Sequence, residues 1–242
     1  MKRFSCKLTF AYFAGVCLAI LPLFSCSARI DGSLAANGSA ATTVSVSLEP
    51  RMTFLIRSLA AAAGQSEGPI LDGPAIAGSM SKAPLGNVSA SFKNTSPSAI
   101  DGTIKITNIS RFLAAGEVGG FIVFEQKGSG GRCEIKIDLD NGPALLKSLS
   151  PEIADYLSAL MAPLATGEKL TKSEYLELVS FVYSKAISDE IASSKIRASI
   201  NFPGQVKSVK GGTFSGKRAN FEIPLIDLLV LETPLSYEVV WN

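Results

Sequence analysis

Short segments in which apolar and polar residues alternate constrain the fold of this chain more than any other feature. They occur at positions 42–49, 88–93, 103–107, 133–138 and 196–202. Alternation of this kind is typical of antiparallel strands that have one buried and one solvated face. It predicts, for example, that Ile200 faces a core while its neighbour Ser199 faces solvent.

Turn signals separate several of these segments. Asn37-Gly38 is a strong signal for a two-residue hairpin, and the glycine-rich run at 128–131 joins two further strand-like segments. Such a glycine run resembles a phosphate-binding loop only in composition. It leads from strand to strand, so no helix N-terminus follows it to hold an anion.

Helical patterns occupy two other parts of the chain. Pro50 opens a predicted helix that extends to about Ala63, with Phe54, Leu55 and Leu59 on its apolar side. Residues 142–194 form a second, longer helical segment.

Two helix starts are predicted within that segment. Ser-Pro-Glu at 150–152 places a serine at the N-cap and a proline at the first helical position. Thr-Lys-Ser-Glu at 171–174 is a capping box for one longer helix that continues through Tyr183 to Ile187. Between the two helical parts, residues 65–86 are rich in Gly, Pro, Ala and Ser and are predicted to form a flexible loop.

The N-terminus carries the pattern of an export signal. Lys2, Arg3 and Lys7 precede the uncharged residues 8–23, and Leu-Phe-Ser-Cys at 23–26 resembles a bacterial lipobox. The pattern predicts a signal peptide at 1–25 and a lipidated Cys26, so that the protein is anchored to a cell membrane or outer membrane and faces outside the cytoplasm. An uncleaved membrane anchor and a secretory signal cut elsewhere are the alternatives; 16 apolar residues are fewer than the roughly 17 to 25 that a spanning helix needs.

Removal of the signal peptide changes the charge of the chain. The full sequence has a formal charge of +2, and residues 26–242 contain 20 Lys and Arg residues against 21 Asp and Glu. A domain with no excess of positive charge offers no electrostatic basis for nucleic-acid binding. We therefore expect no nucleic-acid partner.

The residue inventory argues against several classes of enzyme. The chain contains no histidine, and beyond Cys26 its one remaining cysteine is Cys133. Serine–histidine and cysteine–histidine catalysis are thereby excluded, and a zinc site would need a cluster of cysteines. Ser-Met-Ser-Lys at 79–82 matches a short serine–lysine pattern that arises readily by chance. We predict no catalytic residues, no metal site, no cofactor and no enzymatic activity.

Two apolar stretches of the mature chain are candidates for a ligand surface. One lies in the second predicted helix and the other in the segment 224–231. The candidate residues are Leu176, Val179, Tyr183, Leu225, Leu228 and Leu229.

Parts of the chain resemble a family of bacterial lipoproteins, the LppM-like family. The similarity lies in Ile-Asn-Phe-Pro-Gly-Gln-Val at 200–206, Gly-Gly at 211–212, Ala-Asn-Phe-Glu-Ile-Pro at 219–224, the strand at 99–106 and the hairpin at 121–140. The resemblance implies a curved, largely antiparallel β-sheet with helices packed on one face, and affinity for a lipid or glycolipid. It implies no catalytic residues and transfers no ligand contacts.

These observations predict one α+β domain at residues 26–242. The function they favour is that of a membrane-anchored, non-enzymatic binding module for a lipid or other apolar ligand. The alternative is a structural or assembly lipoprotein whose apolar surfaces bind a protein partner at the cell envelope. Either function would hide apolar area, so composition alone does not separate them.

Overall fold

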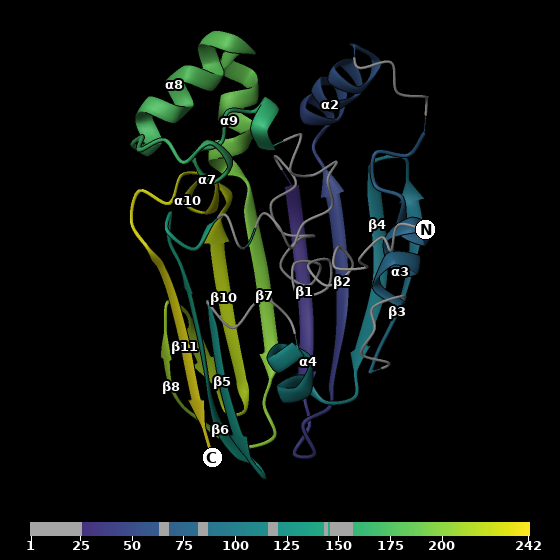
Figure 1. Cartoon of the computed structure of the whole chain (residues 1–242), viewed down its shortest axis with the longest axis vertical. Helices are drawn as coiled ribbons and strands as arrows, with labels where there is room; N and C mark the ends of the chain where they lie inside the picture. Colours follow the sequence, from purple (N-terminus) through teal and green to yellow (C-terminus); the bar gives the residue numbers. More distant parts are fainter. Residues whose placement is uncertain (1–25, 63–67, 82–86, 116–120, 143–144, 146–156) are drawn as a thin grey trace, which may run out of the picture.

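A computed structural model of the chain describes residues 26–62, 68–81, 87–115, 121–142, 145 and 157–242. The predicted signal peptide at 1–25 and the predicted helix start at 150–152 lie outside the described residues. The described part has an α+β fold whose strands are mostly antiparallel, as predicted, but they form two sheets rather than one (Figure 1). That residues 26–242 form a single domain stays a prediction.

The larger sheet has seven strands. They are β1 (Cys26–Leu34), β2 (Ala40–Leu48), β3 (Val88–Ser96), β4 (Ala99–Ile106), β7 (Lys195–Asn201), β9 (Thr213–Ser215) and β10 (Arg218–Pro224). Their order across the sheet is β3-β4-β2-β1-β7-β10-β9. β1 and β7 run parallel, and the other neighbouring strands run antiparallel. The centre of the sheet therefore joins the segment that begins at Cys26 to a segment about 170 residues later.

The smaller sheet has four antiparallel strands, in the order β5-β6-β11-β8. They are β5 (Ile122–Lys127), β6 (Gly130–Ile137), β8 (Val206–Lys210) and β11 (Leu235–Trp241). Side chains from both sheets meet in one buried cluster, which consists of Leu34, Phe202, Val206, Ala219, Val239 and Trp241. The ring of Trp241 lies 4.6 Å from that of Phe202, centroid to centroid.

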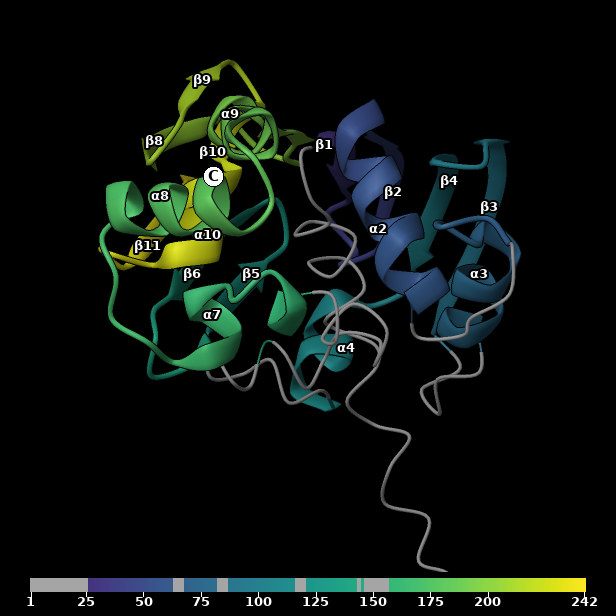
Figure 2. The ribbon, with the colours of Figure 1, turned by 90° about the horizontal axis from the view of Figure 1, so that it is seen from above.

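Helices and the smaller sheet lie on the same side of the seven-stranded sheet (Figure 2). None of the described elements covers its opposite face, which we call the uncovered face. This confirms the predicted placement of helices on one face. The helices are α2 (Pro50–Ala62), α3 (Gly73–Ser81), α4 (Ile109–Ala115), α7 (Pro163–Thr166), α8 (Lys172–Val182), α9 (Lys185–Ser193) and α10 (Leu225–Val230).

The alternating sequence pattern places the strand faces as predicted. In β2, Val44, Val46 and Leu48 are buried, whereas Ser45 and Ser47 between them are exposed. In β7, Ile196 is buried and Arg197 is exposed. Because side chains of a strand point alternately to opposite faces, the apolar set fills the core and the polar set lines the uncovered face.

The predicted long helix beginning at Thr171 is two helices. Its start is confirmed: the Thr171 hydroxyl accepts a hydrogen bond from the backbone N–H of Glu174, whose carboxylate accepts one from the Thr171 N–H. The helix ends at Val182, however, because Ser184 caps a new one by accepting from the Ile187 N–H. The apolar spacing continues through this break, which is why the sequence pattern does not reveal it.

Two further predictions need correction. In α2 the buried residues are Met52 and Ile56, while Phe54, predicted to be on the apolar side, is 74% exposed. The region 65–86, predicted to be a flexible loop, contains the helix α3; its remaining residues 65–67 and 82–86 lie outside the described part.

Asp72 caps the N-terminus of the helix α3. Its carboxylate accepts a hydrogen bond from the Ala75 N–H and its backbone carbonyl accepts one from the Ile76 N–H, at 2.9 Å each. A second contact fixes it on β3, since the Gly73 N–H donates to the side-chain oxygen of Asn94. The small residues that suggested a loop instead let the helix lie close to the sheet.

The strands β1 and β2 are joined by a tight turn at residues 35–39. Gly38 has a φ of 81°, a left-handed conformation that glycine adopts without strain. The turn is held to α4, because the Ile109 N–H donates to the Gly38 carbonyl. The sequence predicted this hairpin, although its loop is longer than two residues. Within the described residues, no helix is long and apolar enough to cross a bilayer.

Candidate functional site

The six residues predicted as an apolar ligand surface all lie in the larger hydrophobic cluster. Val179 of α8 and Leu225, Leu228 and Leu229 of α10 are buried there, with exposures of 4% or less. Leu176 and Tyr183 are half-buried and pack against the same cluster. The structure brings α8 and α10 together, but these side chains fill the core. Their binding of a ligand stays a prediction.

Tyrosine hydroxyls tie this part of the core to the chain before α7. Tyr183 donates a hydrogen bond to the carbonyl of Ala159, and Tyr175 donates to the carbonyl of Leu160 at 3.3 Å. Burial raises the pKa of both phenols above the ordinary value, because the charged form is poorly solvated there. These hydroxyls hold neighbouring segments in place, so a ligand would have to displace packed and hydrogen-bonded groups.

The predicted lipidation residue begins the first strand. Cys26 lies opposite Leu48 in the β1–β2 ladder. Leu48 is two residues before Pro50, where α2 begins. β7 runs parallel on the other side, where Ser27 pairs with Lys195. The point at which the signal peptide would be removed is therefore the first residue of a central strand of the seven-stranded sheet, without an intervening stalk.

A hollow of about 460 Å³ lies at the opposite end of the same strand. The last residues of β1, the first of β2, and the ends of β3 and β4 surround it; Figure 1 shows this end of the sheet near α4. Its lining includes the aliphatic residues Leu34, Ala40, Val88 and Ile106, whose side chains point to the core face. The residues that alternate with them in the strands and point to the uncovered face are Ser33, Ala41, Ser89 and Lys105. A volume of this size is within the usual range for small-molecule sites, about 300 to 1,000 Å³.

Polar groups border the hollow. Asn87 is buried, and its side-chain NH₂ donates to the carbonyl of Asn108, while its side-chain oxygen has no partner among the described residues. The backbone carbonyl of Asn87 accepts from both the N–H and the hydroxyl of Thr107. Lys105 adds a cation that forms no ion pair within the described part of the chain. A lining that includes both aliphatic residues and one cation suits a ligand with an apolar body and a polar or anionic group.

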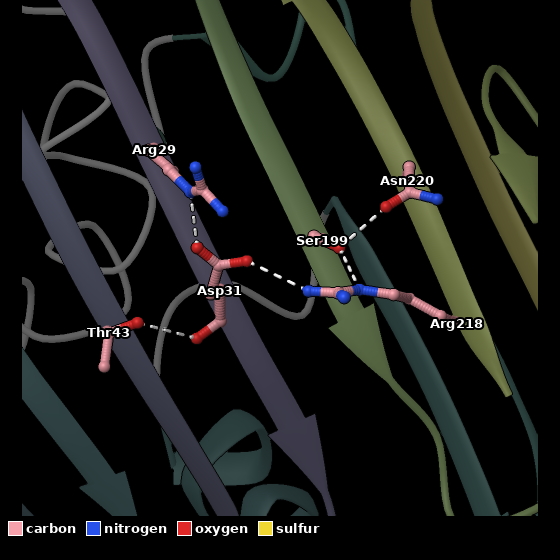
Figure 3. A network of polar contacts seen from close by, with 6 residues as sticks. All are labelled: Arg29, Asp31, Thr43, Ser199, Arg218 and Asn220. Carbon is pink, nitrogen blue, oxygen red and sulfur yellow. Dashed lines mark hydrogen bonds and ion pairs between the residues drawn. The ribbon is translucent and has the colours of Figure 1, made fainter.

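The uncovered face of the seven-stranded sheet carries a network of polar side chains (Figure 3). Asp31 on β1 accepts from Arg29 at 2.7 Å and from Arg218 on β10 at 3.2 Å. Arg218 also donates to the hydroxyl of Ser199, which in turn donates to the Asn220 side chain at 2.7 Å. Three neighbouring strands, β1, β7 and β10, supply these groups, so the network runs across the sheet rather than along one strand.

A second group of charges lies on the same face, nearer the end at which Cys26 lies. Glu222 pairs with Lys195 at 2.6 Å and with Arg197 at 3.2 Å. The hydrogen bond from Lys195, followed by that from Arg197, holds the pKa of Glu222 below its ordinary range. Paired cations and acids of this kind describe a hydrated surface, and the groups lack the isolated, buried carboxyl typical of acid–base catalysis.

Cys133 lies between the two sheets, where it packs against the Trp241 cluster. Desolvation raises the pKa of its thiol to about 12. A thiol held protonated in this way is a poor nucleophile and a poor metal ligand. Among the residues that the structure describes, no three His, Cys, Asp or Glu side chains gather as a metal site would require.

Comparisons with known proteins found one similar solved structure and no similar family model or curated protein. Among solved structures, the NMR structure of the folded domain of LppM from Mycobacterium tuberculosis is similar over 90% of each chain, with 10% sequence identity and a TM-score of 0.40. At that level of similarity, no residue's role transfers from LppM to this chain.

Sequence patterns gave no indication of the hollow. Its lining consists largely of Ser, Ala, Thr and single aliphatic residues from four strand ends, which are common at such positions. Only strand pairing brings them together: Ala40 lies opposite Ile106, and Val88 lies on the other side of Ile106. Lys105, which forms no ion pair among the residues that the structure describes, is the feature that could have drawn attention to it.

Proposed function

We propose that this protein is a membrane-anchored, non-enzymatic lipoprotein that binds a lipid or another ligand with an apolar body and a polar group. The ligand site is the hollow at the end of β1, rather than the predicted surface on α8 and α10. The observation that carries the proposal is the hollow itself, which combines aliphatic lining residues with a lysine that forms no ion pair within the described residues.

The anchor in this proposal is Cys26. Support for it comes from the lipobox-like sequence at 23–26 and from the position of Cys26 as the first residue of a central strand. One acyl chain gives only marginal membrane binding, so stable anchoring requires more than one lipid chain on this cysteine. Mass spectrometry of the N-terminal peptide would decide whether Cys26 is modified; an unmodified cysteine contradicts the anchor.

A bulky substitution tests the hollow directly. Ala41 lines it and is exposed, so Ala41→Trp fills the space without entering the core. Ser45→Trp is the matched control, because Ser45 lies on the same strand and face but does not line the hollow. Native mass spectrometry of the full chain, isolated from its own membrane, should show co-purified ligand with Ser45→Trp and with the unsubstituted chain, and little with Ala41→Trp.

The cation is tested by a second pair of variants. Lys105→Gln removes the charge beside the hollow, whereas Lys93→Gln removes a charge of the same face away from it. We expect less bound ligand with Lys105→Gln than with the unsubstituted chain, and no decrease with Lys93→Gln. Equal ligand content in all four variants would show that the hollow is not the site. A chain without ligand that co-isolates with one protein would favour the assembly role instead.

A further inference from the structure

Two exposed phenylalanines lie on separate helices at the end of the molecule where β1 begins. Phe54 on α2 is 74% exposed and Phe181 on α8 is 91% exposed. Figures 1 and 2 show α2, α8 and α9 together at this end, beyond the strands of the seven-stranded sheet. Exposed apolar patches mark sites of contact with a partner protein or a membrane, whereas single exposed apolar residues do not.

Helix geometry shows that both rings point away from the core. Phe54 lies two residues from Met52 and two from Ile56, which are both buried. Phe181 lies two residues after the buried Val179. Two residues correspond to about 200° around a helix, so each ring is on the side opposite to its helix's packed side. Val182, 47% exposed, extends the apolar surface beside Phe181.

The position of Cys26 identifies what this surface meets. Cys26 pairs with Leu48, two residues before α2, so Phe54 lies within about 20 Å of it. α9 ends two residues before Lys195, which is the partner of Ser27 in β7. Both helical parts therefore rise from the strand ends that flank the lipidation position.

We infer that Phe54 and Phe181, with Val182, form a docking surface that inserts into the interface of the bilayer holding Cys26. The inference rests on the proposed lipid anchor, which brings the bilayer to this end of the molecule. The contact is apolar rather than electrostatic, because the three helices carry balanced charge. Their charged residues are Arg51, Arg57, Lys172 and Lys185 against Glu174, Glu177, Asp189 and Glu190.

Some of these charges are already engaged with one another. Arg51 lies 3.8 Å from Glu190, and Lys185 forms an ion pair with Asp189 at 2.6 Å. This arrangement leaves no net attraction for anionic lipid. Docking should consequently occur on a zwitterionic bilayer and persist at high salt.

The test uses the full chain, allowed to be exported and processed, and then placed in phosphatidylcholine vesicles with brominated acyl chains. An environment-sensitive fluorophore is attached at Phe54→Cys, Phe181→Cys or Phe214→Cys, each in a chain with Cys6→Ala and Cys17→Ala. Phe214 is the control, because it is 46% exposed but lies opposite Ala219 near the other end of the sheet. The chain without an added cysteine gives the background.

We expect several-fold stronger quenching by the brominated lipid at positions 54 and 181 than at 214. The difference should remain in 1 M salt, where the Debye length is about 3 Å. Equal quenching at the three positions, or quenching lost at high salt, overturns the inference.

The mass of the N-terminal peptide, measured on the same preparation, separates this inference from the anchor. Lipidated Cys26 without preferential quenching means that the anchor is right and the docking surface wrong. Preferential quenching at positions 54 and 181 with an unmodified Cys26 means that the docking surface is right and the lipid anchor is wrong.

Discussion

Asp31 on β1 and Arg218 on β10 form an ion pair of 3.2 Å across β7, although 187 positions separate them in the chain. The arginine also contacts Ser199 of the strand between them. It therefore links all three strands at the place where the sheet changes from antiparallel to parallel pairing. Formation of this contact requires that two segments from opposite ends of residues 26–242 are side by side.

The first prediction concerns this ion pair. Asp31→Asn removes the carboxylate that Arg29 and Arg218 share, and exposed ion pairs contribute at most about 1 kcal/mol. We expect the free energy of unfolding in urea to fall by no more than that, and the loss to shrink in 1 M salt. Asp101→Asn is the control, since Asp101 shares this face but has no ion pair within the described residues. Identical losses for both variants would contradict a role for the network.

The second prediction tests the two faces of β7. Ile200 packs at the edge of the cluster between the sheets, whereas Ser199 lies on the uncovered face. Ile200→Asp places a charge against apolar side chains and should cost at least about 2 kcal/mol. Ser199→Asp keeps the new charge on the hydrated face beside Arg218, although it alters the hydrogen bonds of the Ser199 hydroxyl, and should cost about 1 kcal/mol or less. Thermal melting curves of the two variants would decide, and equal melting temperatures would show that the faces are assigned wrongly.

The third prediction concerns the thiol of Cys133. Burial raises its pKa to about 12, so at pH 8 it should react with Ellman's reagent very slowly in the folded chain and at once in guanidinium. The folded pKa lies above the unfolded one. The resulting stability is therefore complete below about pH 8.5 and is lost as the pH rises from there towards 12.

The control for this third prediction is Cys133→Ala, which has no thiol at this position to ionise. Urea unfolding at pH 8 and pH 10 should show a smaller decrease in stability for this variant than for the unsubstituted chain. Rapid labelling of the folded chain, or the same decrease in both proteins, would mean that the thiol is not held protonated.

Local features of the sequence predicted local structure well. The capping box at Thr171 and Glu174 depends on residues three positions apart, so its hydrogen bonds can be inferred without knowing the fold. The alternation in β2 and β7 likewise identifies the buried side of each strand. The same reasoning failed at Phe54, because two apolar faces of α2 were available and only packing against the rest of the molecule selects one.

Partners that are distant in the chain could not be predicted in this way. Alternation shows which face of a strand is buried but not which strand lies beside it, so the division into two sheets was missed. β11, for example, joins β6 and β8 rather than the strands of the larger sheet. The hollow depends on the same distant pairings. The apolar residues chosen from the sequence were found in the core, where large aliphatic residues ordinarily lie.

The length of β1 determines how far the hollow lies from Cys26. The eight residue steps from Cys26 to Leu34 span about 26 Å, at about 3.3 Å per residue. If acyl chains hold Cys26 at a bilayer surface, the hollow opens well beyond the lipid head groups, in the aqueous space. A lipid that reaches it must already have left its own membrane. The strand would thus act as a fixed spacer, and the protein would receive cargo in transit rather than extract it from the bilayer beneath.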